Sequence, residues 1–92
     1  MSKAAARHIL VKTEAECNDL KTKIAAGEKF EELAKKHSLC PSGRQGGALG
    51  TFSRGQMVPE FDRVVFNEEV GKVHGPVKTQ FGYHLVEVTM RS

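Results

Sequence analysis

Long apolar runs and disulfide-forming cysteines are what this 92-residue sequence most clearly lacks. No run approaches the roughly 20 apolar residues that a membrane-spanning helix requires. The opening residues, MSKAAARHILVK, are too short and too soon charged for a secretory signal. We therefore expect a cytoplasmic protein that has no membrane partner.

Cysteine occurs only at Cys17 and Cys40. A small secreted scaffold would normally carry more cysteines, and no CxxC or CxxH spacing indicates a metal site. We expect two free thiols in a reducing compartment, and neither a metal ion nor a cofactor.

An excess of charge of one sign is also missing. The formal net charge is only +3, and the lysines and arginines are scattered along the chain. A nucleic-acid binder would show a basic stripe with exposed aromatic residues, so this function is not indicated. With 39% hydrophobic and 27% charged residues, the composition is that of a single globular domain over residues 1–92, which we expect to be monomeric.

The first half of the chain has the pattern of one strand followed by two helices. Residues 7–11, RHILV, favour a β-strand. Thr13 and Glu16 then form a capping box at the start of a helix, which Gly27 ends. A second, shorter helical pattern covers residues 29–38.

The second half begins with a loop over residues 39–47 and a short strand over 48–52. Pro59 suits the first turn of a third helix, which we expect over residues 59–67, before Gly71. Its inner face would be formed by Phe61, Val64 and Val65. Residues 83–90 alternate as a final strand. This order predicts an α+β fold in which helices pack on a mostly antiparallel sheet.

Two histidines fall on strand faces that otherwise carry apolar side chains. His84 alternates with Val86 and Val88, and His8 shares its face with Leu10. One interior histidine is usually a hydrogen-bonded core residue. A pair at the two ends of one chain indicates a functional site more strongly.

Residues 46–61, GGALGTFSRGQMVPEF, fit neither the helical nor the strand period. Glycine inside a regular element costs roughly 0.5–1 kcal/mol, so four glycines in this stretch are not typical of an ordinary core segment. This stretch is part of a longer block, residues 38–61. The chain resembles the parvulins, in particular their stand-alone bacterial form, in this block, in HILVK at 8–12 and in GPVKTQFGYHLVEV at 75–88. The resemblance implies a parvulin-like four-stranded sheet with surrounding helices.

The same resemblance implies peptidyl-prolyl cis/trans isomerase activity on proline-containing peptides and folding proteins. It places the substrate proline ring in an apolar pocket formed by Leu49, Met57 and Phe61. We expect the latter two to surround the ring rather than lie deep in the core. It also implies a polar cluster of His8, Cys40, Thr79 and His84, in which the histidines chiefly orient the network.

Rotation about an X–Pro bond breaks no covalent bond, so the reaction needs no nucleophile. We therefore prefer a non-covalent mechanism to attack by the Cys40 thiolate, which would need a nearby base. The alternative from another class is a non-catalytic, chaperone-like module that only binds proline-containing peptides.

Three positions differ from the family pattern. Ala48 replaces an acidic residue that many members carry. Lys12 is followed directly by the helix cap, without the basic loop of phosphorylation-directed relatives, and a lone lysine selects phosphate poorly. Phe81 replaces a small polar residue and joins the substrate site as an apolar group. We expect apolar rather than phosphorylated residues before the proline to be preferred.

Overall fold

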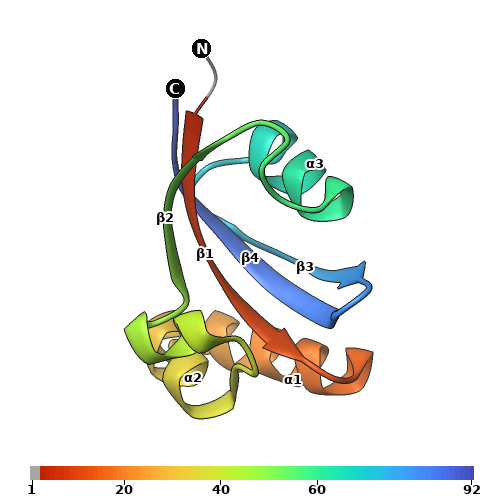
Figure 1. Ribbon diagram of the computed structural model, residues 1–92. Coiled ribbons are helices and arrows are strands. Elements are labelled where there is room, and N and C mark those ends of the chain that lie inside the picture. Colours follow the sequence, from red (N-terminus) through yellow and green to blue (C-terminus); the bar gives the residue numbers. More distant parts are fainter. Residues whose placement is uncertain (1–2) are drawn as a thin grey trace.

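The structure is a computed structural model that describes residues 3–92. In chain order its elements are β1 (Lys3–Val11), α1 (Glu14–Ala25), α2 (Phe30–His37), the 3-10 helix η1 (Pro41–Gln45), β2 (Ala48–Ser53), α3 (Pro59–Asn67), β3 (Val73–Thr79) and β4 (Gly82–Arg91). The strands form one sheet of order β2-β1-β4-β3 (Figure 1). Each neighbouring pair is antiparallel, so the predicted α+β class with a four-stranded antiparallel sheet is confirmed.

The helix signals in the sequence locate the three helices well. Thr13 caps α1, because its hydroxyl oxygen accepts a hydrogen bond from the Glu16 backbone N–H at 3.2 Å. Pro59 occupies the first turn of α3 as predicted. Helix α3 ends at Asn67, also as predicted. Arg91 of β4 accounts for this end, because its guanidinium donates to the carbonyl oxygens of Val65 and Glu68.

Strand β3 has no clear signal in the residue pattern. The pairing of β3 with β4 is irregular between His74 and Val77, where Gly75 and Pro76 interrupt the ladder. Proline cannot donate to a sheet and glycine weakens a strand, so β3 lacks the alternation that marks the other strands. Its position at the sheet edge tolerates both residues.

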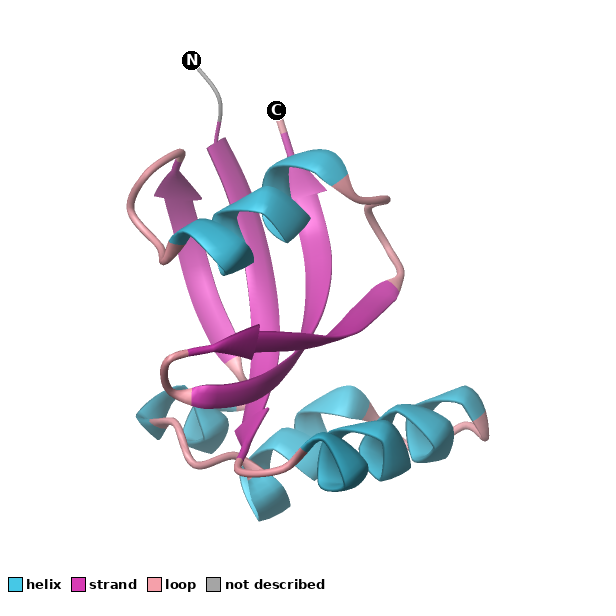
Figure 2. Ribbon diagram, turned by 90° about the vertical axis from the view of Figure 1, so that its right-hand side faces the viewer, coloured by secondary structure: helices cyan, strands magenta, loops and turns pink. Residues whose placement is uncertain are grey.

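The two sheet faces are covered by different helices. Helices α1 and α2 cover one face, and α3 crosses the other (Figure 2). The first core contains Ile9, Val11, Cys17, Leu20, Phe30, Leu33, Ala34 and Leu85. The second contains Ala4, Ala6, Phe52, Phe61, Val65, Phe66 and Val86. Because side chains alternate along a strand, His8 and His84 lie on the face that α3 covers.

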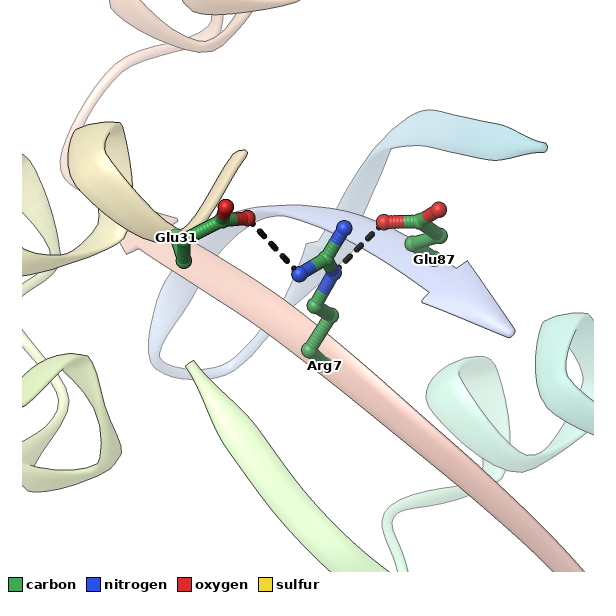
Figure 3. A network of polar contacts seen from close by, with 3 residues as sticks. All are labelled: Arg7, Glu31 and Glu87. Carbon is green, nitrogen blue, oxygen red and sulfur yellow. Dashed lines mark hydrogen bonds and ion pairs between the residues drawn. The ribbon is translucent and has the colours of Figure 1, made fainter. Parts of the chain in front are cut away.

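An arginine network holds β1 in place next to His8. Arg7 donates from Nε to Glu87 of β4 at 2.6 Å and from Nη1 to Glu31 of α2 at 2.9 Å (Figure 3). Its guanidinium carbon also lies 4.9 Å from the centre of the Phe30 ring. One half-buried side chain thus connects two strands and a helix on the face opposite to His8.

The ends of β1 and β4 lie side by side (Figure 1). Ala4 pairs with Arg91, and the Ser92 backbone N–H donates to the Lys3 carbonyl oxygen at 2.9 Å.

Within residues 3–92, no helix has the length and apolar character to cross a membrane.

Candidate active site

A cavity of about 380 Å³ opens on the α3 side of the sheet. It lies between β1, β4, the start of α3, and the chain around η1. Its lining consists of His8, Leu10, Leu39, Cys40, Pro41, Leu49, Met57, Val58, Phe61, Phe81 and His84. We call it the main cavity; apart from the two histidines and one cysteine, its walls are apolar.

All four predicted apolar site residues line the main cavity. Leu49 and Met57 are half-buried, whereas Phe81 at the rim is 62% exposed. Leu39 is also exposed at the rim, at 55%. The two exposed side chains extend the apolar surface outward from the cavity.

Phe61 lies deeper than the sequence led us to expect. It is only 3% exposed and belongs to the second core, where it contacts Phe52 with a distance of 6.4 Å between ring centres. The expectation that Phe61 surrounds the ligand without being a core residue is therefore wrong. It sits in the first turn of α3 and also lines the main cavity, so its ring serves both core and cavity.

The two predicted histidines meet at the base of the main cavity. Nδ1 of His8 lies 3.0 Å from Nδ1 of His84, and their nearly parallel rings have centres 5.1 Å apart. The ring of Phe61 stands almost perpendicular to both, at 5.5 Å from His8 and 5.9 Å from His84. The aromatic wall thus holds the imidazole pair in one orientation.

Each histidine has a second partner at its other ring nitrogen. His8 Nε2 lies 3.2 Å from Ser42 Oγ, and His84 Nε2 lies 2.7 Å from Thr79 Oγ1. We call this series, Ser42–His8–His84–Thr79, the histidine chain. Thr79 does not line the cavity, but it supports His84 from behind and is 7% exposed.

The histidine chain can be satisfied with both imidazoles neutral. The backbone N–H of Phe81 donates to Thr79 Oγ1 at 3.2 Å, which leaves the threonine hydroxyl proton for His84 Nε2. His84 then donates from Nδ1 to His8, and His8 donates from Nε2 to Ser42. Each ring nitrogen has a partner in this arrangement.

Burial keeps the histidines uncharged. Burial, and secondly the charge that His84 would carry, lowers the pKa of His8 from 6.5 to about 4. Burial also lowers the pKa of His84. A proton added to both rings would place two N–H groups against each other at Nδ1, so the observed pair requires at least one unprotonated nitrogen.

Ser42 is the member of the network that the sequence did not reveal. The family resemblance instead places Cys40 in the polar cluster, and Cys40 lines the cavity as a half-buried free thiol. Among residues 3–92, however, no hydrogen bond involves its sulfur, and Ser42 is the partner of His8. Serine is common in loops, so only the 3-10 turn that begins at Pro41 distinguishes this one.

Gly47 allows the loop to approach β1 at the site. Its carbonyl accepts a hydrogen bond from the His8 backbone N–H at 3.0 Å. A Cβ atom there would lie 2.3 Å from the His8 carbonyl oxygen, and φ is +86°. Only glycine fits this contact and this backbone conformation, so the glycines of the 46–61 segment help to place His8.

The geometry disfavours acid–base and nucleophilic chemistry. All four ring nitrogens of His8 and His84 are engaged within the histidine chain, so neither ring can take a proton from Cys40 without breaking it. A thiol nucleophile would need such a base. An apolar cavity with a fixed, neutral polar base suits the binding and twisting of a ligand.

Comparison with known proteins gives a consistent assignment. A family model described as rotamase, PPIC-type PPIase domain, matches residues 3–90. The foldase protein PrsA of Geobacillus sp. (strain WCH70) is 48% identical over 88 residues, which are 95% of this chain and 32% of that protein. The chain thus spans about a third of the length of this relative.

Solved structures agree in fold. The PrsA peptidylprolyl isomerase of Bacillus anthracis superimposes with a TM-score of 0.96 at 38% identity, over 99% of this chain and 42% of that chain. The Pin protein of the archaeon Cenarcheaum symbiosum gives a TM-score of 0.84 at 42% identity, over 96% of this chain and 92% of that chain. Because the family model matches nearly the whole chain and the solved structures share its fold, the chain belongs to the PPIC-type peptidyl-prolyl cis/trans isomerases, the parvulins.

Proposed function

We propose that this parvulin isomerises X–Pro bonds without a covalent intermediate, with the proline ring in the main cavity. The observation that carries the proposal is the apolar cavity whose base is a histidine pair with every ring nitrogen engaged. In this role Leu49, Met57 and Phe61 contact the ring, and the histidine chain holds the cavity base rigid.

The barrier to rotation is about 18–20 kcal/mol because the twisted imide loses its resonance. A cavity that strips water from the imide and fits the twisted form better than either planar form lowers this barrier. The apolar walls remove water, and the fixed positions of Phe61 and the histidines define the shape. Neither task requires a metal ion or a cofactor.

We also propose that apolar residues before the proline are preferred to phosphorylated ones. Leu39 and Phe81 give the cavity rim an apolar surface, against which an aliphatic side chain can pack. Lys12 directly follows β1 and α1 begins at Glu14, which leaves no room for a basic loop. A single exposed lysine gives little selectivity for phosphate.

Matched peptides with leucine, alanine or phosphoserine before proline test this preference. We expect kcat/KM to decrease in that order, and Phe81→Ser to reduce the advantage of leucine over alanine. Lys12→Gln is the matched control, because it should change neither apolar peptide. Faster turnover of the phosphoserine peptide by the wild-type protein would contradict the proposed preference.

The cellular role that we propose is assistance to folding proteins. Relatives of the chain are named foldases, and the exposed apolar rim suits unfolded segments better than compact surfaces. We propose that the domain acts as a monomer on such segments. Its location in the cytoplasm stays a prediction from the sequence.

A further inference from the structure

A smaller hollow adjoins the main cavity. It has a volume of about 220 Å³ and is lined by Val58, Pro59, Glu60 and Gln80. Val58 also lines the main cavity, so the two spaces share one lining residue. A peptide segment with its proline in the main cavity would therefore place a neighbouring residue close to this side hollow.

The walls of the side hollow come from the two segments that also shape the main cavity. One is the start of α3, and the other is the turn between β3 and β4. That turn is fixed, because the Phe81 backbone N–H donates to Thr79 Oγ1 at 3.2 Å and Thr79 in turn holds His84. The hollow is thus part of the same ordered framework as the histidine chain.

Charge distinguishes the two spaces. The main cavity contains no charged side chain, since its histidines are neutral. The side hollow is lined by Glu60 and Gln80, whose side chains carry a carboxylate and an amide oxygen. Both are acceptors suited to a lysine or arginine side chain.

The carboxylates of Glu60 and its neighbour Asp62 differ in their hydrogen bonding within the protein. The Asp62 carboxylate accepts a hydrogen bond from the Gly55 backbone N–H at 3.1 Å, so it stabilises the preceding loop. In the part of the chain that the structure describes, 3–92, Glu60 forms neither a side-chain hydrogen bond nor an ion pair.

The basic residues near Glu60 in the sequence do not neutralise it. Arg63 follows one turn later on α3 but forms no ion pair with it within residues 3–92. The guanidinium of Arg54 lies over the Phe66 ring at 4.7 Å. Lys78 is exposed on β3. The Glu60 carboxylate can therefore accept a basic group from a ligand.

We infer that the side hollow is a second subsite, which selects a lysine or arginine within two residues of the proline, at a position other than the one directly before it, where we propose an apolar side chain. This inference rests on the proposed use of the main cavity for the proline ring. The aliphatic part of the basic side chain packs on Val58 and Pro59, and its charged end reaches Glu60 and Gln80. The alternative is a purely structural role, in which Glu60 only stabilises the positive end of the α3 dipole.

The test uses peptides in which norleucine is replaced by lysine, one position at a time, at the two residues on either side of proline. Norleucine has the aliphatic stem of lysine without the charge. We expect lysine at one position to raise kcat/KM by about two- to fivefold at low salt, the range of an exposed ion pair. High salt should reduce this gain. Glu60→Gln should abolish it, whereas Glu32→Gln, an exposed change on α2, should preserve it.

Binding followed by the amide shifts of Glu60 and Gln80 separates this subsite from the mechanism. Lysine-dependent binding that disappears in Glu60→Gln supports the subsite even if turnover of the norleucine peptide is absent, which would overturn only the catalytic proposal. Normal turnover without a lysine preference at any position would overturn the subsite. A lysine preference that survives Glu60→Gln would overturn it too.

Discussion

The Nδ1 atoms of His8 and His84 lie 3.0 Å apart, although 76 positions separate the two residues in the sequence. The antiparallel pairing of the first and last strands brings them together, with Leu10 opposite His84 and His8 opposite Val86. Because only one of the two nitrogens can donate, the protonation states of both rings are coupled. This arrangement predicts how stability depends on pH. It also predicts how substitutions of the outer partners and of the cavity residues change stability and activity.

The free energy of unfolding should fall as pH is lowered from about 6.5 toward 4. The His8 pKa is about 4 in the folded protein and 6.5 ordinarily, so between these values the unfolded state binds the proton that the folded state excludes. Stability then rises with pH. Urea unfolding near neutral pH and near pH 5.5 measures the difference, which should be smaller in His8→Asn. Equal pH dependence in both proteins would show that His8 is not held neutral.

Thr79→Val should damage the site more than Thr79→Ser. Valine keeps the shape but leaves the buried His84 Nε2 without its partner at 2.7 Å, and an unsatisfied buried polar group costs about 1–3 kcal/mol. Serine keeps a hydroxyl and should largely restore stability and kcat/KM. Thermal unfolding together with peptide turnover measures both effects. A valine variant as active as the serine variant would show that the Thr79 hydroxyl does not contribute to activity.

Ser42→Ala should lower kcat/KM more than Cys40→Ser does. Alanine deletes the 3.2 Å contact to His8 Nε2, whereas the Cys40 sulfur makes no hydrogen bond within residues 3–92 and serine keeps a small polar group there. Cys40→Asp should also retain measurable activity. Complete inactivity of both Cys40 variants, together with a thiol adduct trapped on the wild-type protein, would instead establish covalent catalysis.

Met57→Ala should reduce catalysis with little loss of stability. Met57 is half-buried and lines the main cavity, so we expect kcat/KM to fall at least about tenfold, the equivalent of roughly 1.4 kcal/mol of lost transition-state contact. The core control Leu33→Ala should lose about 2–5 kcal/mol of stability. A Met57→Ala protein that unfolds as readily as the control, with normal specific activity in its folded fraction, would place Met57 in the core.

Phe61 requires a milder substitution. Because it is 3% exposed and packed in the second core, Phe61→Ala should itself lose about 3–5 kcal/mol of stability. Phe61→Leu keeps an apolar side chain but removes the ring edge-on to both histidines. We expect it to remain folded and to lose activity, as measured by circular dichroism and turnover on the same samples. Full activity in a folded leucine variant would limit Phe61 to a packing role.

Regular elements with local signals could be predicted from the sequence. The Thr13 cap, the Pro59 helix start and the alternation around His84 each depend on residues close together in the chain. The deviations come from distant contacts. Strand β3 is interrupted at Gly75 and Pro76 and is held by its pairing with β4, and no pattern local to β3 contains that information.

The site shows the same division. Both histidines could be proposed from the strand faces on which they lie, and the apolar residues from the family resemblance. Ser42 could not, since its role depends on the 3-10 turn that points it at His8 across 34 positions. The depth of Phe61 could not be predicted either, because a pocket that shares a wall with the core gives no separate sequence pattern.

Exchange NMR on a short apolar-X–Pro peptide, with catalytic amounts of protein, tests the central claim most directly. Unaided interconversion takes tens of seconds or more, so cis/trans exchange peaks at short mixing times require catalysis. The account predicts such peaks with wild-type protein, without added metal or cofactor, and their strong reduction with Met57→Ala. Broadened peptide lines without accelerated exchange would contradict it and identify a module that only binds proline-containing segments.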